Sequence, residues 1–199
     1  MRLVTIQDKA AYTELCETGV LRCKPELAEW LNENCFLKAY NWLVEQMKQR
    51  IGEPTPGVTY PIWAWHLLDG KPAKVDLRKR EFNNYFGEQY ALTIEVPDNL
   101  VLLSDEENWH FVLNGWHFGD SENESDYDKE DAWFDALPPD EKQAVKLKSW
   151  ERIFDVRPYK SEWRRSGLYV QATFWELRME QVIKIKRFIG RQKKQEDSG

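Results

Sequence analysis

The chain has 199 residues with a formal net charge of −6, and 42% of them are hydrophobic. Its apolar runs are far shorter than the roughly 20 residues that a membrane span needs, and no basic region followed by an apolar core opens the chain, so we expect a cytoplasmic protein without a membrane segment. No Gly/Ser-rich or Pro-rich linker divides the sequence, which predicts a single α+β domain over residues 1–190 and a disordered tail over 191–199.

The N-terminal part predicts a strand followed by helices. Residues 3–7 (LVTIQ) have the β-branched content of a strand, and Asp8 is placed to cap a helix that ends at Gly19. A second helix is expected from Pro25, which suits a first helical turn. The strongest helix prediction covers residues 36–51, where apolar side chains recur with a period of about 3.6.

The middle of the chain predicts strands joined by turns. Residues 58–68 (VTYPIWAWHLL) are rich in β-formers and follow a turn cluster at 53–57. Residues 76–89 are polar and aperiodic, which indicates a long loop. Two further strands are expected over 90–96 (YALTIEV) and 100–104 (LVLLS).

The last part of the chain alternates helices and strands. Asp105 is expected to begin a helix, and a further helix is expected over residues 139–154. Between them, the acidic stretch 119–132 has almost no aliphatic residue, which predicts a solvated loop. Closing strands are expected over 168–177 (LYVQATFWEL) and 181–188 (QVIKIKRF).

Several segments together resemble a family of bacterial proteins known as domain of unknown function 3841. They are MRLVTIQDKAAYTELCETGVLR, YPIWAWH, EVPDNLVLLSDEENWHFVLN and YVQATFWELR. The resemblance covers nearly the whole chain, and it implies no particular activity.

A fainter resemblance is to the ADP-ribosyltransferase superfamily, in its branch that modifies thymidine bases of DNA. It rests on LVTIQ…LCETGVL, YPIWAW and VQATFWEL, which are similar to that superfamily's first strand and helix, its aromatic-Pro middle strand and its late strand. The resemblance implies a split antiparallel sheet with flanking helices. It also implies a cleft for a nucleotide-like ligand, with NAD as the candidate substrate.

The resemblance further implies catalytic candidates on the late strand. Transfer of ADP-ribose passes through an oxocarbenium-like state that a carboxylate stabilises, and the superfamily places a glutamate there. Aligned on its Gln-Ala pair, this chain has Thr173 at that position, so the catalytic residues are altered. Alternation along the strand turns Gln171 and Thr173 toward the cleft and Glu176 to the opposite face unless a bulge intervenes.

Candidates for ligand binding lie on the first and middle strands. Where the superfamily has a His or Arg that holds the adenosine ribose, this chain has Thr5 or Gln7. Tyr60 is a candidate for stacking on a planar ring, as are Trp63 and Trp65, which share one strand face. The alternative for the two tryptophans is packing against the long helix.

A basic aromatic segment offers a different class of function. Its residues could contact phosphates and stack on unpaired bases of a nucleic acid; they are Arg157, Lys160, Trp163, Arg164 and Arg165. The alternative is that this basic part and the acidic residues 104–142 neutralise each other across one surface.

The histidines and cysteines do not predict a metal site. His66, His110 and His117 lack Cys or acidic partners at ligand spacing, so they are interpreted as ordinary hydrogen-bonded side chains. The cysteines are odd in number and form no C-x-x-C pair, which indicates reduced thiols. The preferred hypothesis is therefore binding of a nucleotide-like ligand such as NAD. The alternative is a nucleic-acid or protein interaction module.

Overall fold

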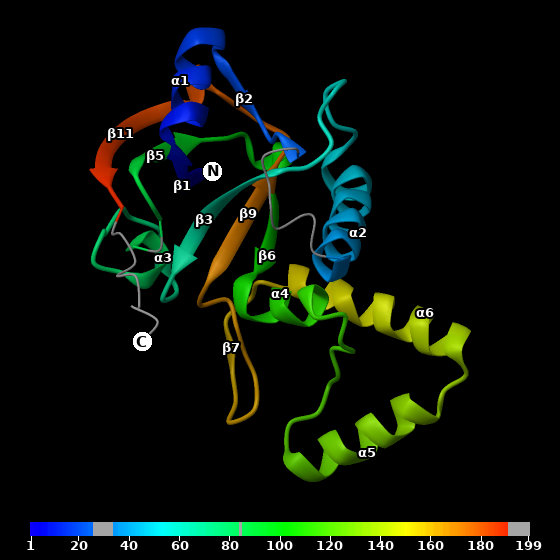
Figure 1. Ribbon diagram of the computed structural model, residues 1–199. Coiled ribbons are helices and arrows are strands. Elements are labelled where there is room, and N and C mark those ends of the chain that lie inside the picture. Colours follow the sequence, from blue (N-terminus) through cyan, green and yellow to red (C-terminus); the bar gives the residue numbers. More distant parts are fainter. Residues whose placement is uncertain (26–33, 84, 191–199) are drawn as a thin grey trace, which may run out of the picture.

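A computed structural model describes residues 1–25, 34–83 and 85–190 (Figure 1). It shows a mixed α/β fold around a seven-stranded sheet with the order β11-β5-β1-β3-β9-β6, in which β4 pairs with β3. The strands are β1 (Arg2–Asp8), β3 (Ile62–Leu68), β4 (Lys71–Pro72), β5 (Glu88–Glu95), β6 (Leu102–Asp105), β9 (Val170–Phe174) and β11 (Val182–Ile189). Two small sheets pair β2 (Val20–Arg22) with β10 (Glu176–Arg178), and β7 (Tyr159–Lys160) with β8 (Arg165–Ser166). Neighbouring strands in these sheets run antiparallel to each other.

The helices flank this sheet, and several of their ends follow from local sequence. They are α1 (Lys9–Thr18), α2 (Asn34–Ile51), α3 (Arg80–Asn83), α4 (Glu106–Leu113), α5 (Glu124–Ala136) and α6 (Pro139–Trp150). The Asp8 side chain accepts a hydrogen bond from the backbone N–H of Ala11, and Asp105 does the same for Asn108. Gly19 ends α1 in the left-handed conformation, with φ of 77°. The sequence-based predictions of the Asp8 cap, of the α1 end at Gly19 and of a helix beginning at Asp105 are confirmed.

The sheet is split between β1 and β3. All seven residues of β1 pair with β5, whereas the register of these fully described strands pairs β1 with β3 only at Val4 and Trp65. Beyond that point the Thr5 hydroxyl donates to the carbonyl of Trp63 at 2.8 Å, so a side chain replaces part of the missing ladder. The sheet therefore consists of a β11-β5-β1 block and a β3-β9-β6 block that diverge from one contact (Figure 1).

Apolar side chains cover both faces of the sheet. On one face, buried residues of β1, β3, β5 and β9 form a cluster that includes Leu3, Ala64, Leu92 and Phe174. On the other face, α2, α4 and α6 pack a second cluster, which includes Trp109 and Trp150. This two-sided burial holds the two blocks in place and leaves the split between β1 and β3 as the break in the sheet.

The structure corrects the prediction for the acidic stretch 119–132. Residues from Glu124 onward form α5 instead of a loop, and the Asn123 side chain caps this helix by accepting the N–H of Asp126 at 3.0 Å. Acidic residues in a first turn are favoured by the helix dipole, which offsets the scarcity of aliphatic side chains.

Other predictions differ in smaller ways. The loop expected over 76–89 contains the short helix α3 and ends where β5 begins, and the strand expected from residue 58 begins at Ile62. Most of the helix expected after Pro25 and the tail 191–199 lie outside the described residues. The domain boundary at residue 190 stays a prediction.

Candidate functional site

A cavity of about 1180 Å³ lies where β1 and β3 diverge. Consecutive residues of both strands line it, among them Thr5 and Ile6 on β1 and Trp63 and Ala64 on β3. Because consecutive side chains of a strand point to opposite faces, the cavity extends into the split itself and not just along one face. Helix α1 and strand β2 form its outer wall, in the upper part of Figure 1.

The β1 wall carries a chain of hydrogen bonds. Gln7 Nε2 donates to the Thr5 hydroxyl at 2.8 Å, and that hydroxyl donates in turn to the carbonyl of Trp63. Thr5 is 2% exposed, so its hydroxyl is committed to the fold, whereas Gln7 is partly exposed at the cavity. Of these two predicted ligand-binding residues, Gln7 is the one with a side chain placed to meet a ligand.

The β3 wall brings the two predicted tryptophans together. Trp63 and Trp65 both line the cavity from the same strand face. The Trp63 ring also packs against Tyr40 of α2 and Trp109 of α4, with centroids 5.9 and 5.5 Å apart. Packing on the long helix, which was the alternative for the tryptophans, is therefore correct for Trp63, and it coexists with a place in the cavity wall.

Gln171 is the β9 residue that reaches the cavity. It pairs with Trp65 on one side and with Ser104 of β6 on the other. Its Oε1 is buried and has no hydrogen-bond partner among the described residues, and the same is true of the Trp63 Nε1. The orientation predicted for Gln171 from strand alternation agrees with this placement.

Two predicted cleft residues lie elsewhere. Thr173 is 0% exposed, and its hydroxyl lies 3.3 Å from the carbonyl of Leu102, its neighbour on β6. Tyr60 is 8% exposed, belongs to the core and donates to the Asn41 side chain at 2.9 Å. The prediction that both face an open cleft is wrong, because close-packed helices cover this part of the sheet.

Glu176 lies on β10, in the small sheet beside the cavity. Its Oε2 accepts from Nε and Nη2 of Arg22, both at 3.1 Å, and its Oε1 accepts from Arg178 at 2.5 Å. Burial opposes the charged carboxylate, but the two arginines outweigh it and hold the pKa of Glu176 below its ordinary value. Arg22 lines the cavity and so stands between it and this carboxylate.

The outer wall was missed by the sequence analysis. It brings charged residues to the cavity from α1, from β2 and from the segment after β2, including Lys9, Glu14, Arg22 and Lys24. Glu14 forms an ion pair with Lys24, and Lys9 lies 3.5 Å from Glu88. The turn at Gly19 and the apolar Val20 and Leu21 are a local signal for β2. No local feature of the sequence indicated that β2 folds over the split between β1 and β3.

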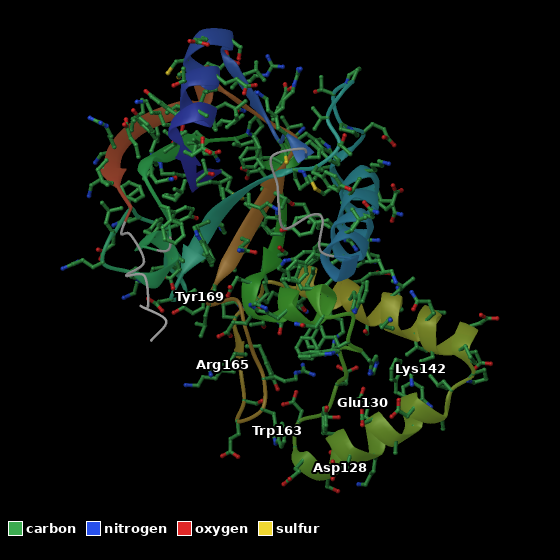
Figure 2. The ribbon with its side chains drawn as sticks, viewed as in Figure 1. Asp128, Glu130, Lys142, Trp163, Arg165 and Tyr169 are labelled. Atoms are coloured by element: carbon green, nitrogen blue, oxygen red, sulfur yellow. The ribbon has the colours of Figure 1, made fainter. Side chains whose placement is uncertain are left out.

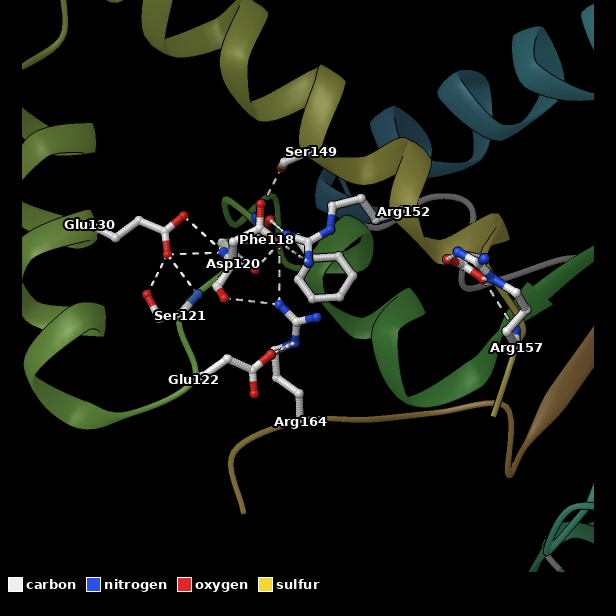
Figure 3. Close-up of polar contacts among 11 residues, drawn as sticks. Phe118, Asp120, Ser121, Glu122, Glu130, Ser149, Arg152, Arg157 and Arg164 are labelled. Atoms are coloured by element: carbon white, nitrogen blue, oxygen red, sulfur yellow. Dashed lines mark hydrogen bonds and ion pairs between the residues drawn. The ribbon is translucent and has the colours of Figure 1, made fainter. Parts of the chain in front are cut away.

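Two of the four cationic side chains in the predicted basic segment pair with acidic side chains (Figure 3). Arg164 contacts Asp120 and Glu122, each at 3.3 Å, and Arg157 contacts Asp155. The contacts of Arg164 join the basic segment to the acidic residues 104–142, which favours mutual neutralisation of the two parts at this residue.

The remaining basic-segment residues lie on the β7–β8 hairpin side of the molecule (Figure 2). Lys160 and Arg165 are exposed. The Trp163 ring stacks on Tyr127 of α5 at 6.4 Å and 10°. A role in nucleic-acid binding stays a prediction.

The helix α5 is fixed to the loop before it by one carboxylate. Glu130 accepts hydrogen bonds from the backbone N–H groups of Asp120 and Ser121 and from the Ser121 hydroxyl (Figure 3). Burial raises the pKa of Glu130, but these donors outweigh it and lower the pKa below its ordinary value. The contact therefore stabilises the fold above the ordinary carboxyl pKa and is lost as the pH falls through the lowered one.

The histidines have separate environments. Burial lowers the pKa of His66, and His117 stacks on Phe134 with a centroid distance of 4.4 Å. Within residues 1–25, 34–83 and 85–190, no group of three or more metal-ligating side chains is found. Cys16 carries a free thiol.

The fold and the site define a mixed α/β protein with a ligand-sized cavity in a split antiparallel sheet. The chain belongs to the family described as domain of unknown function (DUF3841), whose model matches residues 2–183. Searches among curated proteins and among solved structures found no match to the chain. No helix in the described part of the chain has the length and apolar composition to cross a bilayer. The cytoplasmic location stays a prediction.

Proposed function

We propose that the cavity between β1 and β3 binds a nucleotide-like ligand, with NAD as the first candidate. The observation that carries the proposal is the cavity itself, since ligand sites are concave, mostly apolar and contain a few convergent polar groups. Its volume of about 1180 Å³ exceeds the roughly 300–1,000 Å³ of typical small-molecule sites, so it has room for a dinucleotide. Trp63 and Trp65 supply aromatic walls, and Gln7 and Gln171 supply amides.

The arrangement of strands supports the same proposal. The resemblance to ADP-ribosyltransferases implied a split sheet and a cleft for a nucleotide-like ligand, and this cavity lies where β1 diverges from β3. The first, middle and late strands that carried the resemblance are β1, β3 and β9, and each contributes a lining residue.

The proposal covers binding of the ligand only. It does not include transfer of ADP-ribose by the residues that the resemblance implied as catalytic. Strand β9 (VQATF) carries no carboxylate, and Thr173 is buried on it. Glu176 is held by Arg22 and Arg178 and stands behind the cavity wall. A carboxylate so paired has little capacity to stabilise positive charge that develops in the cavity.

Titration with NAD tests the proposal. We expect saturable heat in calorimetry with one NAD per chain and a dissociation constant below 1 mM, about −4 kcal/mol or stronger. Tryptophan fluorescence should fall in parallel, because an aromatic ligand would stack in contact with Trp65. A Trp65→Phe variant should lose part of this fluorescence change, and a Trp133→Phe variant, altered at an exposed residue of α5, should keep all of it. No heat and no fluorescence change at millimolar NAD would contradict the proposal.

A further inference from the structure

Three buried polar atoms without partners gather on one face of the β3-β9-β6 block. They are Trp63 Nε1, Gln171 Oε1 and Ser104 Oγ, and none has a hydrogen-bond partner among the described residues. Gln171 is directly opposite Ser104 in the β6–β9 register. Trp63 is opposite Thr173 and so is the diagonal neighbour of Gln171 on the same face, about 7–8 Å away.

These three polar atoms form no hydrogen bond within the described part of the fold. Buried polar groups are nearly always hydrogen-bonded, and each exception costs stability that an apolar side chain of the same shape would not cost. Other buried hydroxyls of the same sheet have acceptors, since Thr5 donates to Trp63 O and Thr173 lies within reach of Leu102 O. A bound group that forms hydrogen bonds with these atoms would remove that cost.

The chemistry of the three atoms limits what that group is. The indole N–H of Trp63 donates only, so it needs an acceptor on the ligand. Gln171 Oε1 accepts, so it needs a donor, and the Ser104 hydroxyl serves as either. An acceptor next to a donor in one plane is the edge of an amide. A carboxamide and the lactam edge of a nucleobase both present it.

We propose that Trp63, Gln171 and Ser104 form a recognition point for a planar amide edge of the ligand. The proposal rests on the proposed function, because Trp63 and Gln171 are cavity-lining residues and Ser104 lies beside Gln171. In this proposal the three side chains determine specificity, because they favour a ligand that carries a planar amide edge. The rest of the cavity binds the parts that related ligands share.

Calorimetry with matched ligand pairs tests the assignment. NAD and 3-acetylpyridine adenine dinucleotide keep the same ring and carbonyl and differ by the amide NH2, which a methyl group replaces in the second, and inosine monophosphate and purine riboside monophosphate differ by the lactam edge. We expect wild-type protein to bind the edge-bearing member of one pair about tenfold more tightly, as one well-placed hydrogen bond predicts. The pair that shows this preference tells whether the recognised edge is a carboxamide or the lactam edge of a nucleobase. In Gln171→Leu this preference should vanish while the affinity for the other member stays unchanged. Gln143→Leu, altered at an exposed residue of α6, is the control and should retain the preference.

Thermal unfolding without ligand supplies a second readout. Gln171→Leu removes a buried acceptor that has no partner, so its melting temperature should equal or exceed that of wild type. A fall of several degrees would show that the amide serves the fold, and it would overturn the assignment. Binding of edge-bearing and edge-lacking ligands with equal affinity would also overturn it, and would leave the proposed function standing. Binding of none of the four ligands would overturn both.

Discussion

Ala10→Trp is expected to abolish binding of NAD, with a loss of affinity of about a hundredfold or more. Ala10 is an exposed residue of α1 that lines the cavity, so an indole at this position occupies space that the ligand needs. A ligand would then have to expel the indole or give up its own contacts, and a hundredfold loss corresponds to about 2.7 kcal/mol. The measurement is calorimetric titration with NAD.

The stability of Ala10→Trp separates blockage from unfolding. Because the residue is exposed, the free energy of unfolding should change by about 0.5 kcal/mol or less. The matched control is Ala132→Trp, at an exposed alanine of α5 outside the cavity lining, which should bind NAD as wild type does. Full affinity in Ala10→Trp would mean that the ligand binds somewhere other than the split.

Phe174→Ala is expected to lower the free energy of unfolding by about 3–5 kcal/mol. Phe174 is 1% exposed and belongs to the cluster on the face of β9 opposite to Gln171. Its removal costs the transfer free energy of the ring and leaves a void between both blocks of the sheet. Urea unfolding followed by circular dichroism gives the value.

The control for this variant is the same substitution at an exposed phenylalanine. Phe86 is 54% exposed, so Phe86→Ala should change stability by less than about 1 kcal/mol. Similar losses in both variants would contradict the two-faced core, and with it the rigid placement of β9 that brings Gln171 to the cavity.

Local signals were sufficient for several elements of the fold. The capping side chain of Asp8, the left-handed Gly19 and the period of residues 36–51 each act within one or two helical turns, and the structure has them as predicted. The α5 prediction failed because its support is not local. Glu130 is anchored by N–H groups about ten residues earlier, and Trp163 reaches α5 from a distant hairpin.

The predictions for the site residues also succeeded where local sequence decides the structure and failed where distant contacts do. Strand alternation predicted that Trp63 and Trp65 share one face of β3 and that Gln171 and Thr173 share one face of β9, since that property depends on each strand alone. The register between β3 and β9 pairs these residues on one face of the sheet. Alternation could not show that α2 and α4 cover the part of this face that holds Thr173. Nor could it show that Arg22 arrives from β2, because strand pairing over more than 150 residues leaves no local pattern.

The most direct measurement of where a ligand binds is a crystal structure of the protein with NAD. The account predicts electron density for the dinucleotide between β1 and β3, in contact with Gln7, Trp65 and Gln171. Density for NAD elsewhere on the molecule, with the split left open, would contradict it.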